Sequence, residues 1–229
     1  MNMQGRVVLV TGAKGGLGSF VTQIFLNAGA TVVGTSRSIQ QSDFPRPTFT
    51  AIAADLSDAT AVGELVNSVV AKFGRIDVLA HVAGGFAGGQ SIADTDDKTW
   101  QQMQSMNLTS AFYLLRAVVP HMRKANYGRI VAVGSLAAVE PHAGLGAYVV
   151  SKVGLASLVR TVALESADMN ITANVVLPGT MDTPGNRAAM PNAEFSKWAQ
   201  PSKVAKLIMF LAGEDAAQIS NTLVPIEGH

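Results

Sequence analysis

Short runs of aliphatic and β-branched residues alternate along the chain with longer stretches in which apolar residues recur every three or four positions. A short continuous apolar run is typical of a buried strand, and the wider spacing is typical of an amphipathic helix. The predicted strands are residues 7–11, 31–35, 49–53, 77–82, 129–134, 171–177 and 222–225. The predicted helices are residues 16–28, 58–73, 96–106, 108–124, 148–167 and 201–211.

The predicted strands are almost uniformly apolar rather than alternating, which is typical of parallel strands with helices on both faces. Right-handed crossovers between successive strands then produce a doubly wound sheet. Residues 36–48 and 180–200 lack either pattern and are predicted to be loops, and no repeat or long linker divides the chain. Residues 1–229 are therefore predicted to form one α/β domain with about seven parallel strands.

Composition narrows the possible partners. Charged residues make up 14% of the chain and the formal net charge is +1, so nothing favours nucleic acid or an anionic membrane. The chain has no cysteine, which excludes disulfides and thiolate chemistry, and its histidines at 81, 121, 142 and 229 lack metal-ligand spacing. Residues 1–6 do not resemble a signal peptide, and no apolar run approaches the ~20 residues of a membrane span. A cytoplasmic protein without a metal is expected.

A glycine-rich segment, TGAKGGLG at residues 11–18, follows the first predicted strand and opens the first predicted helix. Glycines permit a tight turn and a close approach of the backbone to a pyrophosphate, while the helix N-terminus offers unpaired N–H groups. This position favours a dinucleotide-binding turn over an ordinary strand–helix connection, and hence a Rossmann-type sheet. The predicted cofactor contacts in the turn are Gly12, Gly16, Leu17 and Gly18.

The spacing of the turn, T-G-x3-G-x-G, resembles the signature of the short-chain dehydrogenase/reductase family. The resemblance extends over essentially the whole chain, through Asp55-Leu56 after the third strand, Ala83-Gly84 after the fourth and Pro178-Gly179 after the sixth. It implies that these residues and Thr183 contact the cofactor, with Asp55 at the adenine. His81 and Val82 replace the two asparagines of the family's N-N-A-G motif, which removes the side chains of its usual local hydrogen bonding.

The end of the second predicted strand indicates which nicotinamide cofactor binds. An acidic residue at this place usually holds the ribose 2′-hydroxyl of NAD(H), whereas this chain has Ser36 followed by Arg37. No carboxylate is there to repel a 2′-phosphate, and a guanidinium is there to pair with one. Lys14 adds a second cation from the glycine turn. These charges favour NADP(H) over NAD(H), and the alternative is that both cations are merely solvated.

A Y-x3-K pair stands at the start of the helix predicted over residues 148–167. Tyr148 and Lys152 are about one turn apart, so both side chains lie on one helix face. A free phenol has a pKa near ~10, which a nearby ammonium and an oxidised nicotinamide should both lower. The family resemblance implies that Tyr148 is the general acid/base, that Lys152 tunes it and binds ribose, that Ser135 orients the substrate oxygen, and that Asn107 helps to hold a water linked to the lysine.

Two further segments resemble one branch of the family, quinonoid dihydropteridine reductase. Residues 82–89, VAGGFAGG, are similar to its V-A-G-G-W-A-G-G segment, and residues 177–198 resemble its loop after the sixth strand. This resemblance implies that the loop covers the nicotinamide and part of the substrate. Phe86 and Trp198 are then candidates to flank a flat heterocycle.

Other residues depart from that branch, which has an acidic residue where Ser36 stands and lacks the full complement of Ser135 and Asn107. The substrate class therefore stays open between a small carbonyl or alcohol and a pteridine-like ring. His142, in a predicted loop, is a further candidate at the mouth of the site.

Alternatives of other classes are a cofactor-sensing regulator and an interaction module on the same fold. The intact catalytic set argues against both, because a sensor has no need of a proton-transfer group. Residues 108–119 and 154–164 are apolar enough to pair subunits, so a homodimer or homotetramer is expected.

Overall fold

The computed structural model describes residues 1–228, and His229 lies outside the described residues. Its strands form one seven-stranded sheet in the order β3-β2-β1-β4-β5-β6-β7, with every neighbouring pair parallel. The strands are β1 (Val7–Thr11), β2 (Thr31–Ser36), β3 (Phe49–Ala53), β4 (Val78–His81), β5 (Gly128–Val133), β6 (Ile171–Pro178) and β7 (Leu223–Ile226). The strand order reverses between β1 and β4, where open α/β sheets bind their ligands.

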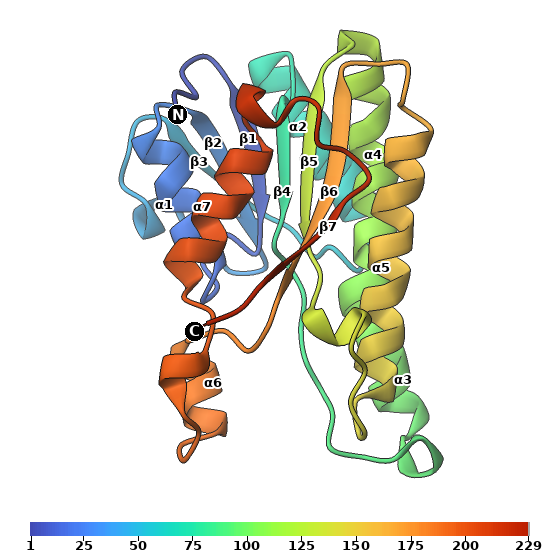
Figure 1. Ribbon diagram of the computed structural model, residues 1–229. Helices are drawn as coiled ribbons and strands as arrows, with labels where there is room; N and C mark the ends of the chain where they lie inside the picture. Colours follow the sequence, from blue (N-terminus) through green and yellow to red (C-terminus); the bar gives the residue numbers. More distant parts are fainter. Residues whose placement is uncertain (229) are drawn as a thin grey trace.

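Helices cover both faces of this sheet (Figure 1), which confirms the predicted doubly wound architecture. The helices are α1 (Gly18–Asn27), α2 (Ala59–Phe73), α3 (Asp97–Met103), α4 (Ser110–Ala125), α5 (Gly146–Leu164), α6 (Pro184–Ala189) and α7 (Pro201–Leu211). Alternate strand residues enter two buried clusters: Leu9 faces the side of α2, α4 and α5, and Val10 faces the side of α1 and α7. Both faces of the sheet are therefore buried under helices, as uniformly apolar strands require.

Several boundaries differ from those predicted. Helix α5 begins at Gly146, so Tyr148 lies in its first turn. The region predicted as a loop over residues 180–200 contains α6, whose first turn is capped by the Thr183 hydroxyl and begins with Pro184. A capping threonine followed by proline is a strong helix start, so the loop prediction was wrong for this short segment.

The two helices predicted at 96–106 and 108–124 are joined by a π-helical turn, Gln104–Thr109. A π-turn inserts a residue into the helical hydrogen-bond pattern and occurs often at functional sites. Here it turns the Asn107 side chain into the protein, where it is fully buried.

Helix α5 is also the one helix in residues 1–228 that is long and apolar enough to cross a membrane, with a mean hydropathy of 1.4. Its buried residues Leu155, Ala156 and Val159 pack in the same cluster as the sheet residues. Packing against the sheet accounts for these residues, whereas Val150 and Val153 on the same helix are exposed.

A charged network ties the sheet together at its amino edge, near the starts of β5 and β6. Arg129 is 0% exposed, and its Nη1 donates to the Asn170 carbonyl at 2.9 Å while its Nη2 lies 3.2 Å from Glu214 Oε2. Arg6 approaches the same carboxylate at 2.6 Å, and both guanidinium groups lie over the Tyr127 ring. The side chains therefore join β5 to the segments before β1, β6 and β7.

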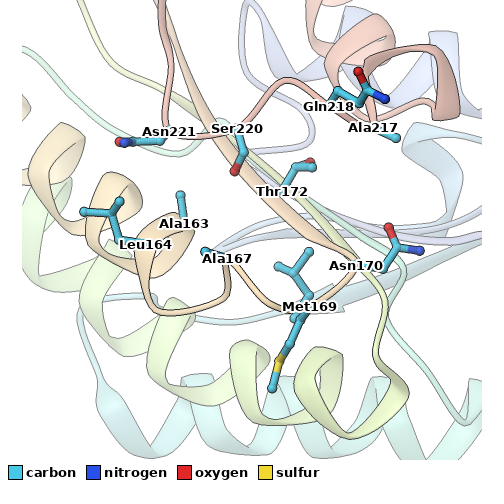
Figure 2. A pocket seen from close by; sticks show the side chains of 11 residues that line it. Ala163, Leu164, Ala167, Met169, Asn170, Thr172, Ala217, Gln218, Ser220 and Asn221 are labelled. Atoms are coloured by element: carbon cyan, nitrogen blue, oxygen red, sulfur yellow. The ribbon is translucent and has the colours of Figure 1, made fainter.

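A cavity of about 250 Å³ lies at the same edge (Figure 2), between the end of α5 and the start of β6. Leu164, Thr172, Ser220 and Asn221 are among its lining residues, and no acid or base lines it. Since ligands of open α/β sheets bind at the carboxyl ends of the strands, this cavity is at the wrong edge for the catalytic site.

Candidate active site

The glycine turn after β1 requires residues without a side chain at several positions. Gly12 has φ +64°, and a Cβ there would lie 3.0 Å from the backbone of Ala83. A Cβ on Gly18 would lie 1.9 Å from the carbonyl oxygen of Gly12, which no side chain allows. Leu17 is buried just before α1 and anchors the helix. The compact turn leaves its backbone open to a ligand, so it fits the pyrophosphate of a dinucleotide.

The segment after β6 closes over this turn. A Cβ on Gly16 would lie 2.9 Å from Cγ2 of Thr183. A cavity of about 470 Å³ lies between the two segments, with Lys14, Gly16, Ser19 and Thr183 among its lining residues. Gly16 and Thr183, both predicted cofactor contacts, are thus brought together from distant parts of the chain.

Tyr148, Lys152 and Ser135 meet at the carboxyl edge of the sheet. The Lys152 ammonium lies 5.9 Å from the Tyr148 ring centroid. It donates a hydrogen bond of 2.9 Å to the Val133 carbonyl at the end of β5. Ser135 lies two residues further along, where its hydroxyl accepts from the Ala137 amide at 3.2 Å. Helix α5 and the end of β5 therefore present two hydroxyls and one ammonium to the same region.

Burial decides the acidity of these groups. It raises the pKa of the Tyr148 phenol, and a hydrogen bond with the Ser135 side chain offsets part of that rise. Burial lowers the pKa of Lys152 to about 8. We expected the ammonium to lower the phenol pKa, but here it is bound to the Val133 carbonyl and the net change is upward. The phenol is therefore protonated at neutral pH, ready to donate rather than to accept a proton.

Asn107 clamps the segment that follows β4. Its Oδ1 accepts from the Gly85 amide at 2.9 Å, and its Nδ2 donates to the Gly85 carbonyl at 3.0 Å. The same Nδ2 donates to the Ser151 hydroxyl at 3.0 Å, which in turn donates to the Tyr148 carbonyl at 2.7 Å. A Cβ on Gly84 would lie 2.7 Å from Asn107 Oδ1 and 3.2 Å from Lys152 Nζ. All four predicted catalytic side chains thus belong to one connected region.

The sequence profile of the short chain dehydrogenase family matches residues 6–194. The chain belongs to this family.

Individual members of the family are similar over their whole length. The chain is 29% identical over 243 residues to the 3-oxoacyl-(acyl-carrier-protein) reductase of Thermotoga maritima, covering 100% of this chain and 98% of the relative. It is 32% identical over 246 residues to the 2,3-dihydro-2,3-dihydroxybenzoate dehydrogenase of Escherichia coli, again covering 100% of this chain and 98% of the relative. The match to the family and to these relatives identifies the protein as an NAD(P)-dependent oxidoreductase.

Solved structures of similar proteins have the same fold. The crystal structure of levodione reductase superposes with a TM-score of 0.92 at 25% identity, covering 99% of this chain and 98% of that one. The structure of ElxO with NADP bound superposes with a TM-score of 0.91 at 28% identity, covering 96% of each chain.

The charges around the adenosine end of this dehydrogenase are in part paired with one another. Lys14 Nζ lies 3.1 Å from Asp43 Oδ2 and donates to the Ser38 carbonyl at 3.1 Å. Lys14 is thus already paired within the protein, and its contact with the cofactor as a second cation stays a prediction. The hydrogen bond from the Gln40 amide and then the Lys14 ammonium hold the pKa of Asp43 below its ordinary value.

Arg37 is exposed just past the end of β2. The Ser36 hydroxyl beside it is buried and has no hydrogen-bond partner within residues 1–228. Asp55 accepts from the Ser57 hydroxyl at 2.7 Å and the Ser57 amide at 2.9 Å, and these bonds lower its pKa. An unpartnered hydroxyl beside an exposed guanidinium fits the ribose end of a dinucleotide.

Leu56 and Pro178 are buried within the fold. Gly179 donates its amide to the Ile226 carbonyl at 3.0 Å. Among the predicted cofactor contacts, these residues support the site by packing and backbone hydrogen bonding; their contact with a cofactor stays a prediction.

The predicted substrate residues are placed differently from one another. Phe86 is 65% exposed, and its ring centroid lies 5.0 Å from that of Tyr148 in an edge-on arrangement. His142 is exposed in the loop before α5. Trp198 is only 7% exposed and packs edge-on against Phe195 at 4.8 Å. A buried Trp198 presents no ring face to a substrate, so the expected sandwich of Phe86 and Trp198 is not formed.

The sequence analysis missed a polar contact between β1 and β4. The Thr11 hydroxyl accepts the amides of Val82 and Ala83, each at 3.1 Å, and lies 2.9 Å from Nδ1 of the buried His81. Thr11 was read as part of the glycine signature and given no role. Strand register carries the missing signal, because Thr11 and His81 end adjacent strands and are paired directly.

In residues 1–228, no group of three His, Cys, Asp or Glu side chains is arranged to hold a metal ion. The polar groups of the site are hydroxyls, one ammonium and one amide, which suit proton transfer to and from an organic substrate.

Proposed function

We propose that the protein is an NADP(H)-preferring oxidoreductase that interconverts a small carbonyl compound and its alcohol, with Tyr148 as general acid/base. The observation that carries the proposal is that α5 and the end of β5 bring Tyr148 and Ser135 to the buried Lys152, whose ammonium lies 5.9 Å from the Tyr148 ring centroid and donates to the Val133 carbonyl. Two hydroxyls that converge at the carboxyl edge of the sheet can both bind one substrate oxygen.

The bound nicotinamide supplies or accepts the hydride at the substrate carbon. The chain's own residues handle the oxygen. In reduction, the Tyr148 hydroxyl donates its proton to the carbonyl oxygen while the Ser135 hydroxyl donates a hydrogen bond to the same atom. In oxidation, Tyr148 acts as the phenolate, which takes the proton of the alcohol and becomes the neutral phenol. Lys152 stabilises the phenolate, because a cation near a phenol favours its ionised form.

The glycine turn and the edge of β2 would hold the cofactor. Gly12, Gly16 and Gly18 leave room for the pyrophosphate, and Ser36 and Arg37 would bind the ribose 2′-phosphate. The hydroxyl of Ser36 without a partner in residues 1–228 and the exposed Arg37 support NADP(H) over NAD(H). An NADP-bound structure among the similar proteins also supports it.

The cofactor preference is tested by calorimetric titration of the protein with NADPH and NADH. We expect Arg37→Gln to weaken NADPH binding about tenfold, since one charge-assisted hydrogen bond is lost, and to leave NADH binding unchanged. Lys124→Gln, an exposed cation at the far end of α4, is the matched control and should change neither. Tighter NADH than NADPH binding by the wild type would contradict the preference.

The reaction is tested with a panel of cyclic diketones, 3-oxoacyl thioesters, dihydrodiols and quinonoid dihydropterin, following the relatives and the sequence. Tyr148→Phe should lower kcat at least about 100-fold while cofactor affinity stays the same. A Tyr148→Phe enzyme with wild-type turnover would show that another group transfers the proton.

A second candidate is the reduction of a pteridine-like ring. The observation that favours it is the exposed Phe86 ring against Tyr148, which offers a flat apolar surface beside the proton donor. Phe86→Leu should then raise KM for quinonoid dihydropterin much more than KM for an aliphatic ketone. Equal effects on both would argue for the carbonyl reaction alone.

A third candidate is a cofactor-sensing regulator without turnover. NADPH binding together with no activity on the whole panel would favour it over both enzymatic proposals.

The protein is also proposed to pair through α4 and α5. Phe112 on α4 and Val150 and Val153 on α5 are exposed apolar side chains, which two copies would cover in a homodimer or homotetramer. Light scattering tests the assembly. The cytoplasmic location expected from the sequence stays a prediction, for which cell fractionation is the measurement.

A further inference from the structure

The hydrogen bonds of Thr11 determine the tautomer of His81. A threonine hydroxyl has one proton to donate and two lone pairs that accept. Both lone pairs of Thr11 are occupied by the amides of Val82 and Ala83, each at 3.1 Å. The hydroxyl proton must therefore point to His81 Nδ1, 2.9 Å away. With Nδ1 as an acceptor, the neutral ring carries its proton on Nε2, which is buried and has no hydrogen-bond partner within residues 1–228.

The surroundings keep this imidazole neutral. His81 is 2% exposed, and burial together with the nearby Lys152 charge lowers its pKa to about 3. A protonated ring would turn an N–H toward the Thr11 hydroxyl proton. The hydroxyl would then have to rotate and give up one of the two backbone amides.

Those amides lie where the cofactor turn meets the catalytic residues. Gly12 follows Thr11 in the chain, and a Cβ on it would lie 3.0 Å from the Ala83 backbone. The next residue, Gly84, lies beside the Lys152 ammonium and the Asn107 amide, as a Cβ at that position would be 3.2 Å and 2.7 Å from them. The orientation of the Thr11 hydroxyl thus affects the position of the backbone next to both the glycine turn and the proton-transfer residues.

We propose that His81 is a positioning residue. Its Nδ1 accepts a hydrogen bond from the Thr11 hydroxyl and so keeps both lone pairs of that hydroxyl on the amides of Val82 and Ala83. These bonds hold Ala83 against the glycine turn and Gly84 beside Lys152. The inference goes beyond the proposed function and rests on it for its catalytic readout. An asparagine at this position also has an oxygen that accepts a hydrogen bond, whereas an apolar residue has no acceptor.

The tautomer is measured first, by nitrogen-15 NMR of the histidine side chains of the wild-type protein between pH 6 and 8. The expected spectrum shows His81 with an unprotonated Nδ1 and a protonated Nε2 throughout. A protonated Nδ1 would overturn the proposal. This measurement needs neither turnover nor cofactor, so its failure is separate from a failure of the proposed function.

Four single variants and one double variant test the consequence, with cofactor affinity from calorimetry and kcat on the best substrate of the panel. His81→Leu leaves the Thr11 hydroxyl without an acceptor and should weaken NADPH binding and lower kcat, each about tenfold. His81→Asn should restore both to within about threefold of the wild type. His121→Leu, on α4, is the control and should change neither.

Thr11→Val completes the test as a double-mutant cycle with His81→Leu. Because both act through one hydrogen bond, the double variant should be no worse than the poorer single variant. Multiplying effects would overturn the proposal, as would a His81→Asn enzyme as impaired as His81→Leu. If His81→Leu fails to fold, His81→Asn, Thr11→Val and the wild-type spectrum still decide the matter. A wild type that binds NADPH or NADH but has no turnover would leave the affinity cycle intact and refute only the proposed reaction.

Discussion

Replacing Asn107 by alanine separates the stabilising role of this buried amide from its role in the site. The amide is 0% exposed and makes three hydrogen bonds with oxygen or nitrogen atoms, two with Gly85 and one with Ser151, besides a long and weak one of 3.9 Å to Met103 Sδ. At about 1 kcal/mol each, the loss of the first three lowers the free energy of unfolding by about 3 kcal/mol. For a chain of this size that corresponds to a fall in Tm of about 6–12 °C.

The catalytic effect of Asn107→Ala should be larger than the loss of stability alone explains. Gly85 would be released from both of its Asn107 hydrogen bonds, and Gly84 beside Lys152 would shift with it. A displacement on the order of 1 Å near reacting groups costs up to about 100-fold in rate. We therefore expect kcat to fall between about 10-fold and 100-fold at 25 °C, where the variant remains folded.

Asn174→Ala is the matched control. Asn174 is also 0% exposed, and its amide joins β6 to the segment before β7 through the Ile219 carbonyl at 2.7 Å and the Thr222 amide at 3.2 Å. It should lower the Tm by about 4–8 °C, since two hydrogen bonds are lost, and leave kcat unchanged.

Thermal melts and steady-state kinetics on the two purified variants measure both effects. An Asn107→Ala protein that melts like the wild type would refute the hydrogen-bond accounting. Equal losses of kcat in both variants would refute the positioning argument, because general destabilisation would then explain them.

Three further outcomes follow from single contacts. Gly18→Ala places a Cβ 1.9 Å from the Gly12 carbonyl oxygen, so the turn must open; calorimetry should show NADPH binding at least about tenfold weaker, and unchanged affinity would contradict the assigned turn. Lys152→Met removes a buried cation whose pKa of about 8 shows that burial opposes its charge, so at pH 7 the Tm should rise while turnover is lost; a lower Tm would mean that the bond to Val133 outweighs burial. His81 has a pKa of about 3 when folded against an ordinary 6.5, so the unfolded chain binds the proton first and stability should fall as the pH drops from about 6.5 toward 3. Urea midpoints at pH 7 and pH 4.5 should show a smaller loss for His81→Asn, and an equal loss would contradict this assignment.

The sheet was predictable because each strand is a continuous apolar run between turn signals, as at Val7–Thr11 and Ile171–Pro178. Helix α6 was not predicted, because six residues are too few to show a periodic apolar face. Thr183 and Pro184 nevertheless have the residue types that are typical of a helix start. The spacing of apolar residues thus predicts the long elements, whereas a helix as short as α6 can be recognised only by its capping residue.

The site was predictable where spacing along one element decides geometry, as for Tyr148 and Lys152 on α5. It was not predictable where a partner comes from another element. The Val133 carbonyl holds Lys152 across the sheet, and Asp43 holds Lys14 from 29 residues away. Trp198 shows the same limit, because its burial depends on Phe195 and on the folding of the whole loop.

The Arg129 network at the amino edge has a practical consequence for redesign. It joins β5 to the segments before β1, β6 and β7 at the edge of the sheet opposite the catalytic residues. Residues 184–197 contain no buried side chain, whereas Trp198 and Ala199 belong to the core, so grafting only residues 184–197 from another family member should change which compounds are turned over and leave the fold intact. The sheet and its amino-edge network can thus be kept while the segment that would contact the substrate is replaced.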